Sequence, residues 1–318
     1  MSEEIIVVKN LKKHFKTDRG VVKAVDGVNF SIKTGDSLGL VGESGSGKST
    51  TAFTIMGVYA PTDGEIYFKG NLLGRKRTKE LKKDMQMVFQ DPGSSLNPRK
   101  NVREIIEQPL RIHKLYEGKE RERVEELLRM VGLPTEFVDR YPRAVGGGEK
   151  QLVAMARALA SDCSFIALDE PTSALDVSMQ ARIINTLIRI QKELNLAYLF
   201  ITHNLSLMRN VASRVGIMYL GKIVEMAPAS EFFQKPLHPY TKMLISSIPV
   251  ITKQEEELKP KKVVSRGEIP SPVNMPTGCT FHPRCNDCME ICTKTEPTMI
   301  EVEPGHLVHC HLFSDKKS

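Results

Sequence analysis

The spacing of apolar and polar residues predicts a strand-rich start to the chain. Residues 4–9 and 21–32 are rich in β-branched residues with partial alternation, and residues 37–41 form a short apolar run. These patterns are typical of β-strands. A glycine-rich turn follows the third strand and leads into a helix predicted from about Lys48 to Val58. Further short strands are predicted at residues 65–68 and 84–90.

The middle of the chain changes to the spacing of amphipathic helices. Between about 101 and 160, apolar residues recur three and four positions apart in segments that begin NVREIIEQPL, ERERVEELL and EKQLVAMARALA. Two apolar strands are then predicted at Phe165–Leu168 and Tyr198–Ile201, with a helix at Val177–Leu194 between them. Because this strand–helix–strand order joins parallel strands, the sequence predicts an α/β fold with a mostly parallel sheet.

The composition of the chain changes near Pro249. Residues 251–264, ITKQEEELKPKKVV, are charged and weakly apolar, so we interpret them as a linker or a hairpin arm. A small cysteine-rich tail follows them. We therefore predict one large domain at 1–250, with a helical subdomain at about 92–160, and a C-terminal extension at 251–318.

Composition and charge narrow the class of protein. The 318 residues are enough to bury a sizeable core, and no apolar run reaches the roughly 18 residues of a membrane-spanning helix. The N-terminus lacks the pattern of a signal peptide, so we expect the protein in the cytosol. The net charge is +7, with lysine clusters at 79–83 and 259–262. No aromatic residues accompany these clusters, and we expect no nucleic-acid partner.

A glycine-rich motif indicates a site for nucleotide phosphates. Residues 42–50, GESGSGKST, fit the P-loop pattern G-x-x-x-x-G-K-[ST] between an apolar strand and a helix. Glycines let backbone amides surround the phosphates, and the helix N-terminus adds a favourable potential. Lys48 is expected to neutralise the β and γ phosphates, and Ser49 to bind Mg²⁺. The predicted nucleotide ligands of this loop are Gly42, Ser44, Gly45, Ser46, Gly47, Lys48, Ser49 and Thr50.

Two carboxylates follow a second apolar strand. Asp169 and Glu170 come directly after Phe165–Leu168 and before the segment PTSALD. At the end of a buried strand, Asp169 is placed to hold Mg²⁺ through water, and Glu170 is suited to polarise an attacking water. We therefore predict ATP hydrolysis with Glu170, Lys48 and His203 as the catalytic residues, the role of His203 resting on the resemblance described next.

These motifs, in this order, make residues 4–250 resemble the ATPases of the ABC family. The resemblance implies a nucleotide-binding domain with a parallel-sheet core, an antiparallel β subdomain and a helical subdomain. It also implies that Phe15 stacks on adenine, that Gln90 contacts Mg²⁺ and senses the permease, and that His203 contacts the γ phosphate. Asp176, at the end of the segment SALD, matches the loop that crosses the dimer interface.

A closer resemblance is to the ATPases of peptide and nickel importers. It rests on QDPGSSLNPR at 90–99, MYLGKIVE at 218–225 and HPYTKMLISSIP at 238–249. The first stretch looks more like the F-type than the D-type of two sister ATPases. The resemblance implies a peripheral subunit at the cytoplasmic face of the cell membrane, with a sister ATPase, two permease subunits and, indirectly, an extracytoplasmic solute-binding protein. A soluble ABC ATPase of a non-transport complex is the alternative, and the cargo stays open.

One motif departs from the family. In place of the signature L-S-G-G-Q, which caps the γ phosphate bound by the opposite subunit, residues 145–149 read VGGGE. The signature positions that act on the partner's site are thus Gly146, Gly147, Gly148 and Glu149. Gly146 lacks the serine hydroxyl. At about 6 Å from a phosphate charge and an effective dielectric near 20, the charge of Glu149 would cost about 3 kcal/mol.

The altered signature affects the partner's nucleotide site and leaves this chain's own site intact. A homodimer would have two poor sites, whereas a heterodimer with an intact partner would keep one good site. We therefore hypothesise an asymmetric heterodimer whose single efficient site is on this chain. The alternative is that Gly146 and Glu149 are tolerated substitutions.

Five of the six cysteines lie in the last 40 residues. In a reducing cytosol such a cluster is more typical of a metal site than of disulfides. Cys279, Cys285, Cys292 and Cys310, with the surrounding PTGCTFHPRC, resemble a tail of some peptide-importer ATPases in which four cysteines hold a [4Fe–4S] cluster. Zn²⁺ is the alternative, since Cys285-x₂-Cys288 has zinc-like spacing and two further thiolates complete four ligands.

Overall fold

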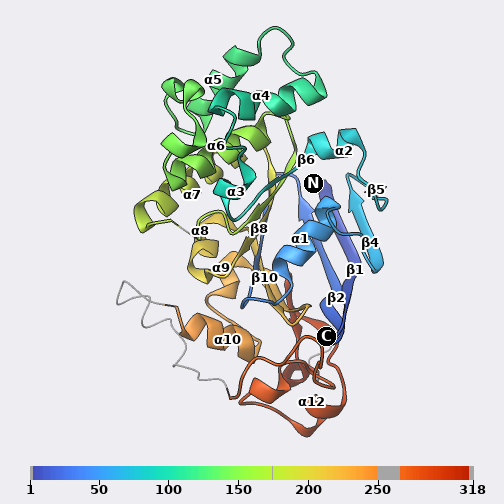
Figure 1. The fold of residues 1–318 in the computed structure, drawn as a ribbon. Helices are drawn as coiled ribbons and strands as arrows, with labels where there is room; N and C mark the ends of the chain where they lie inside the picture. The colour runs from blue at the N-terminus through green and yellow to red at the C-terminus, as the bar shows by residue number, and fades with distance from the viewer. Residues whose placement is uncertain (1–2, 174, 249–265, 315–318) are drawn as a thin grey trace.

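The protein, seen here as a computed structural model, is described over residues 3–173, 175–248 and 266–314, and it contains two sheets (Figure 1). The smaller sheet is antiparallel and has the order β2-β1-β4-β5. Its strands are β1 (Glu4–Thr17), β2 (Gly20–Lys33), β4 (Asp63–Phe68) and β5 (Asn71–Leu72). Strand β1 extends well beyond its predicted range of 4–9, because its polar second half pairs with the start of β2 as a long hairpin, whereas β2 matches the predicted range of 21–32 to within one residue at each end.

The larger sheet has the order β11-β12-β10-β9-β3-β8-β7-β6. Its neighbours from β9 to β6 are parallel, and the remaining pairs are antiparallel, so the predicted parallel core is confirmed within a mixed sheet. Strands β3, β7 and β8 are buried along their whole length, which explains their unbroken apolar runs. The strands are β3 (Ser37–Val41), β6 (Met85–Val88), β7 (Phe165–Asp169), β8 (Ala197–Thr202), β9 (Arg214–Tyr219), β10 (Lys222–Pro228), β11 (Met299–Glu303) and β12 (His306–His309).

Helix α1 packs between the two sheets, and other helices form a separate layer at one end of the molecule (Figure 1). The predicted helical stretch at 101–160 contains α4, α5 and α6, and α4 starts at a capping box formed by Asn101 and Glu104. The predicted strand 84–90 is wrong in part: only β6 is a strand, and the exposed, lysine-rich residues before it form α2. The helices are α1 (Lys48–Met56), α2 (Lys79–Asp84), α3 (Pro92–Ser95), α4 (Val102–His113), α5 (Glu120–Met130), α6 (Gly147–Leu159), α7 (Val177–Leu194), α8 (Met208–Val211), α9 (Ala229–Phe232), α10 (Pro239–Ser246) and α12 (Glu290–Lys294).

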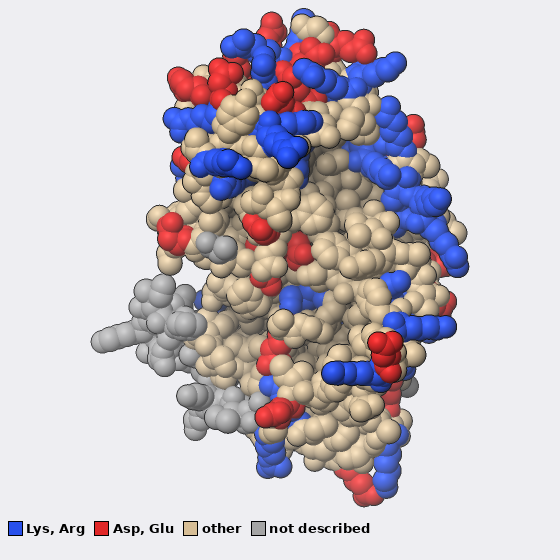
Figure 2. All heavy atoms as spheres, viewed as in Figure 1, with Lys and Arg blue, Asp and Glu red and all other residues tan. Residues whose placement is uncertain are grey.

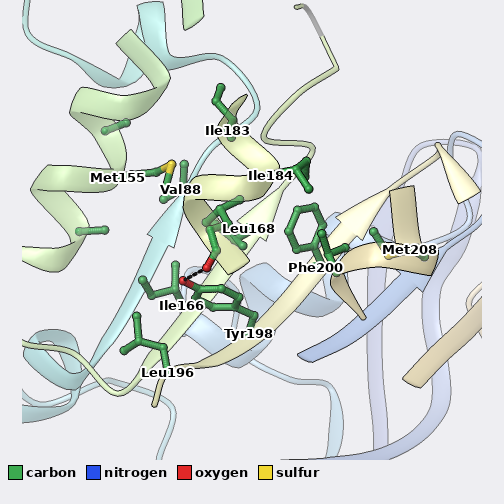
Figure 3. Close-up of a cluster of buried hydrophobic side chains, with 14 of the residues drawn as sticks. Val88, Met155, Ile166, Leu168, Ile183, Ile184, Leu196, Tyr198, Phe200 and Met208 are labelled. Carbon is green, nitrogen blue, oxygen red and sulfur yellow. Dashed lines mark hydrogen bonds between the residues drawn. The ribbon is translucent and has the colours of Figure 1, made fainter. Parts of the chain in front are cut away.

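One hydrophobic core joins the helical layer to the parallel strands (Figure 3). Met155 of α6 and Ile184 of α7 pack with Leu168 and other strand residues in this core. The hydroxyl of Tyr198 donates to the carbonyl of Leu187 at 3.3 Å, which satisfies the one polar atom that the ring buries. Each fully buried Val, Leu, Ile, Phe or Met side chain contributes about 1.5–3 kcal/mol to the free energy of folding. The core therefore fixes the strand ends that carry the site.

The cysteine-rich tail is attached to the larger sheet. Strand β12 pairs antiparallel with β10, with Glu225 opposite Val308, and β11 completes a hairpin at the sheet edge. The sequence predicts a small C-terminal extension and carries no local pattern for this pairing. The division of the chain at residue 250 stays a prediction, and the predicted linker at 251–264, with its lysine cluster, lies outside the described residues.

Candidate active site

A cavity of about 730 Å³ lies where β3 runs into α1. It gathers residues from β1, the P-loop, the ends of β6, β7 and β8, and the tail. Its lining is Phe15, Val22, Ala24, Ser44, Gly45, Gly47, Lys48, Ser49, Thr50, Gln90, Glu170, His203 and Pro272. Most residues predicted for the nucleotide site are thus brought together, while the predicted residues Gly42, Ser46 and Asp169 are not part of the lining.

Two positions of the P-loop have room only for glycine. A Cβ at Gly42 would stand 2.2 Å from the carbonyl oxygen of Met218, and one at Gly47 would stand 2.1 Å from that of Ala24. Gly47 also has φ +105°, which side-chain-bearing residues rarely adopt. The loop therefore packs tightly against β2 and β9, and its following residue, Lys48, starts α1.

Lys48 lies folded against its own loop. Its Nζ donates to the carbonyl oxygens of Gly42 at 2.7 Å and Glu43 at 2.9 Å. Burial lowers the pKa of Lys48, and the nearby carboxylates of Glu170 and Asp169 oppose that shift. A buried cation at the start of a helix is well placed to bind a polyphosphate and neutralise its negative charge.

The end of β7 supplies a carboxylate to the P-loop serine. Ser49 Oγ donates to Asp169 Oδ1 at 2.9 Å. Burial raises the pKa of Asp169, and the hydrogen bond from Ser49 works against that rise. A hydroxyl and a carboxylate oxygen in contact are the ligand types that Mg²⁺ prefers, so the residues present fit the predicted magnesium site.

Glu170 links the other two predicted polar residues. Its Oε1 lies 3.1 Å from His203 Nδ1, and its Oε2 accepts from Gln90 Nε2 at 3.1 Å. The backbone of Glu170 has φ 45°, an uncommon value that turns the chain at the end of β7. Its N–H donates to the carbonyl oxygen of Ile201, which ties this turn to β8. A carboxylate held by a histidine and an amide at the mouth of a phosphate site can orient a water.

Phe15 closes the cavity on the side of β1. Its ring meets Tyr59 edge-on, with centroids 5.3 Å apart, and Lys13 Nζ lies 4.7 Å from its centroid. The ring is therefore half-buried and held by neighbours on the cavity wall. This position agrees with the stacking role that the family resemblance implies, which stays a prediction.

The altered signature does not line this cavity. Gly146 is the N-cap of α6, and Glu149 Oε2 accepts from its N–H at 2.9 Å. Gly148 is buried against Met179, where a Cβ would stand 2.2 Å from the Met179 Cγ. Asp176 caps α7 by accepting from the N–H of Met179 at 2.9 Å. These residues thus lie at the starts of α6 and α7, and none of them lines the cavity at the chain's own P-loop.

Four tail cysteines are buried and one is exposed. Cys279, Cys285, Cys292 and Cys310 are buried free thiols, whereas Cys288 is exposed. The pKa of Cys310 is raised to about 12, mainly by burial, with added repulsion from the other three buried thiols. The backbone N–H of Cys279 donates to the carbonyl of Cys292 at 2.8 Å, so these two residues lie side by side. The four-thiol metal site stays a prediction.

A connection from the tail to the P-loop, which the sequence does not predict, lies beside the cavity. Glu43 accepts from both terminal nitrogens of Arg284 and from the hydroxyl of Tyr240. Pro272 of the tail also lines the cavity. These contacts span about 200 residues of sequence or more, and a carboxylate, an arginine and a tyrosine so far apart carry no local pattern. The P-loop pattern leaves position 43 unspecified, so only the fold reveals these residues.

The arrangement defines a class of protein. A strand, glycine loop and helix around Lys48, with Asp169 on Ser49 and Glu170 beside His203, are the parts with which P-loop ATPases bind and hydrolyse ATP.

The comparisons then identify the family. The model described as ABC transporter matches residues 25–173, and the one described as Oligopeptide/dipeptide transporter, C-terminal region, matches residues 224–292. The oligopeptide transport ATP-binding protein AppF of Bacillus subtilis is 48% identical, over 98% of this chain and 98% of its own length. The dipeptide transport ATP-binding protein DppF of Haemophilus influenzae is 42% identical, over 94% of each. The chain belongs to the family of ABC-type oligopeptide/dipeptide transport ATP-binding proteins.

Solved structures agree with this family and with its ATPase activity. The ATP-binding cassette MJ0796, solved as a dimer in a post-hydrolysis state with ADP and Pi, is 30% identical and covers 71% of this chain and 99% of its own, with TM-score 0.64. The cbiO1 subunit of Clostridium perfringens is 28% identical over 73% of this chain and 92% of its own, with TM-score 0.66. The chain is an ABC-type ATP hydrolase. In the parts that the structure describes, no helix is both long and apolar enough to cross a membrane.

Proposed function

We propose that this chain is the ATP-hydrolysing subunit of a peptide importer. It works at the cytoplasmic face of the membrane against two permease subunits, with cargo delivered by an extracytoplasmic binding protein. Relatives at 42–48% identity over nearly the whole chain are named oligopeptide or dipeptide transport ATP-binding proteins. Three of these names end in F, which supports the F-type assignment. The observation that carries the catalytic role is Glu170 held between His203 and Gln90 on the cavity wall.

Each site residue has one task in hydrolysis. Glu170 orients and polarises the attacking water, and its contact with His203 places that histidine near the γ phosphate. Lys48 and the P-loop amides stabilise charge on the transferred phosphoryl group. Mg²⁺, which Ser49 and Gln90 would hold directly and Asp169 through water, supplies further neutralisation of the phosphate charge. Gln90 therefore connects the reacting centre to the surface that meets the permease.

We also propose that the chain forms an asymmetric heterodimer with a sister ATPase. Glu149 accepts from the N–H of Gly146, the backbone donor at the start of α6. In the family this helix start faces the γ phosphate of the opposite subunit, and here a carboxylate already occupies it. This self-capping supports the idea that the chain is a poor partner for the opposite site, while its own site keeps every catalytic residue.

Steady-state ATPase activity of the purified chain tests the proposed heterodimer. The control is Glu170→Gln, which keeps the side-chain shape and removes the base. Negligible turnover with retained ATP binding is the expected result for a subunit that awaits a partner with an intact signature. Robust turnover that disappears in the control would show that the altered signature is competent and that no heterodimer is needed.

We further propose that the four buried thiols hold a [4Fe–4S] cluster. Thiolates are the usual ligands of such clusters, and four is their normal number. Burial of these four thiols, in contrast to the exposure of Cys288 in the zinc-type pair Cys285-x₂-Cys288, supports this choice of ligands. Iron and sulfide analysis of anaerobically purified protein is the test. One zinc per chain without iron would refute the cluster.

A further inference from the structure

One tail side chain reaches into the P-loop. Arg284 is only 6% exposed, and its Nη1 and Nη2 donate to the two carboxylate oxygens of Glu43 at 2.7 and 3.1 Å. Glu43 is the second residue of the P-loop. The pair is bidentate, a geometry in which the flat guanidinium fixes both the charge and the orientation of the carboxylate. The tail therefore contacts the nucleotide site directly.

The surroundings hold this arginine in place. Phe281, three residues before Arg284, packs on Tyr219 and Tyr240 with ring centroids 5.2 and 5.3 Å apart. The hydroxyl of Tyr240 donates to Glu43 Oε2 and accepts from the N–H of Glu43, both at 3.1 Å. Glu43 is thus hydrogen-bonded to α10 through its backbone N–H, and to both α10 and the tail through its carboxylate. Movement of the tail would move this residue.

Glu43 also contacts the phosphate-binding lysine. Lys48 Nζ donates to the carbonyl oxygen of Glu43 at 2.9 Å, and the negative charge of Glu43 acts on the Lys48 ammonium. Without Arg284, an uncompensated carboxylate would stand one residue before the amides that receive the phosphates. It would repel the polyphosphate and compete with it for Lys48. In this chain, Arg284 supplies the cation that neutralises the negative P-loop side chain.

We propose that Arg284 is a positioning residue of the nucleotide site, and that the tail completes the P-loop by neutralising and orienting Glu43. This role goes beyond the peptide importer proposed above and requires neither the iron–sulfur cluster nor the heterodimer. Because coupling between two sites is reciprocal, nucleotide binding must stabilise the tail by the same free energy by which the tail favours nucleotide binding.

A set of substitutions separates this role from general stability. The measurement is the MgATP dissociation constant, by calorimetry on the full chain in a Glu170→Gln background. Arg284→Met should weaken binding about tenfold, within the range usual for coupled sites. Adding Glu43→Gln to Arg284→Met should recover most of that loss, because it removes the uncompensated charge. Arg266→Ala, which truncates an exposed arginine of the same tail, should leave binding unchanged.

The rescue decides the outcome, because a loss of tail packing would not be repaired by a neutral P-loop residue. Unchanged binding in Arg284→Met, or a double variant as weak as the single one, would overturn the proposal. Should Arg284→Met fail to fold, hydrogen–deuterium exchange on the chain with its natural Arg284 and Glu43 gives an independent test. MgATP should slow exchange of amides at 277–294, and equal exchange with and without MgATP would also overturn the proposal.

Discussion

At the scale of single residues, the conformation of Glu149 bears most directly on activity. Its carboxylate caps the N–H of Gly146, so the helix start that should face a partner's phosphate carries a negative charge. The cap stabilises α6 locally by satisfying a donor that has no partner within the helix. Under the proposed heterodimer, the same contact would let the helix fold normally while the opposite subunit's site would lack a competent signature.

Restoring the signature should therefore restore activity to the chain alone. We expect the double substitution Gly146→Ser, Glu149→Gln to raise its ATPase rate by about 10²-fold, because one lost transition-state donor typically costs that much. Steady-state phosphate release measures the effect. The same pair of substitutions in a Glu170→Gln background should stay inactive. A rate equal to that of the unmodified chain would show that these positions do not limit hydrolysis.

Burial separates the thiols of the chain by reactivity. Cys163 is buried in the core, and burial raises its pKa to about 12, whereas Cys288 is exposed. Because the thiolate is the reactive form and Cys163 stays protonated far above its ordinary range, it should resist iodoacetamide at pH 8.5 until the protein unfolds. Cys288 should be alkylated in the folded protein. Mass spectrometry of peptides from folded and urea-treated samples reports both sites, and early labelling of Cys163 would contradict the structure.

At the scale of elements, a buried contact between a histidine and a carboxylate joins strand β12 of the tail hairpin to β10 of the larger sheet. His306 Nε2 lies 2.8 Å from Glu225 Oε1, and both side chains are fully buried. The carboxylate of Glu225 also accepts from the N–H groups of Leu237 and His238. Glu225 thus satisfies donors from β12 and from the segment before α10. Removal of the Glu225 carboxylate would leave these three buried donors without this acceptor.

Truncation of this carboxylate should be costly. We expect Glu225→Ala to lower the free energy of unfolding by about 3–5 kcal/mol, because it leaves three buried donors unpaired at about 1–3 kcal/mol each. Urea unfolding followed by far-ultraviolet circular dichroism measures the change. Lys235→Ala is the matched control, because Lys235 pairs with Glu303 of the same hairpin at the surface. That substitution should cost less than about 1 kcal/mol. Equal effects of the two would mean that burial of Glu225 is not what matters.

The elements also show what the sequence can predict. Strands β3, β7 and β8 and the P-loop were predictable because each is a contiguous pattern with a local physical cause. Helix α2 was missed because its exposed, charged residues have no apolar period. The pairing of β12 with β10 and the contact of Arg284 with Glu43 join residues about 80 and 240 apart. Such pairings depend on the whole fold, so a single sequence carries no signal for them.

At the scale of the whole molecule, charge is distributed unevenly. Charged side chains of both signs crowd the helical end around α4 and α5, and basic residues continue along the side of α2, whereas the middle of this face carries few charges (Figure 2). A middle with fewer charges than the helical end is typical of the centre of an interface. It is consistent with the proposed heterodimer, in which this region would meet the sister ATPase.

In the assembled complex, we expect nearly all ATP hydrolysis to occur at this chain's own nucleotide site. In a reconstituted complex, Glu170→Gln in this chain should reduce ATP hydrolysis by at least about 10²-fold, since a general base contributes that much. The matching glutamate substitution in the sister ATPase should reduce the rate less than threefold, because the sister's own site would be capped by this chain's VGGGE segment and contribute little from the outset. Sedimentation velocity with MgATP confirms that both variants still associate. Equal losses from the two substitutions would mean that both sites turn over, and the asymmetric arrangement would have to be abandoned.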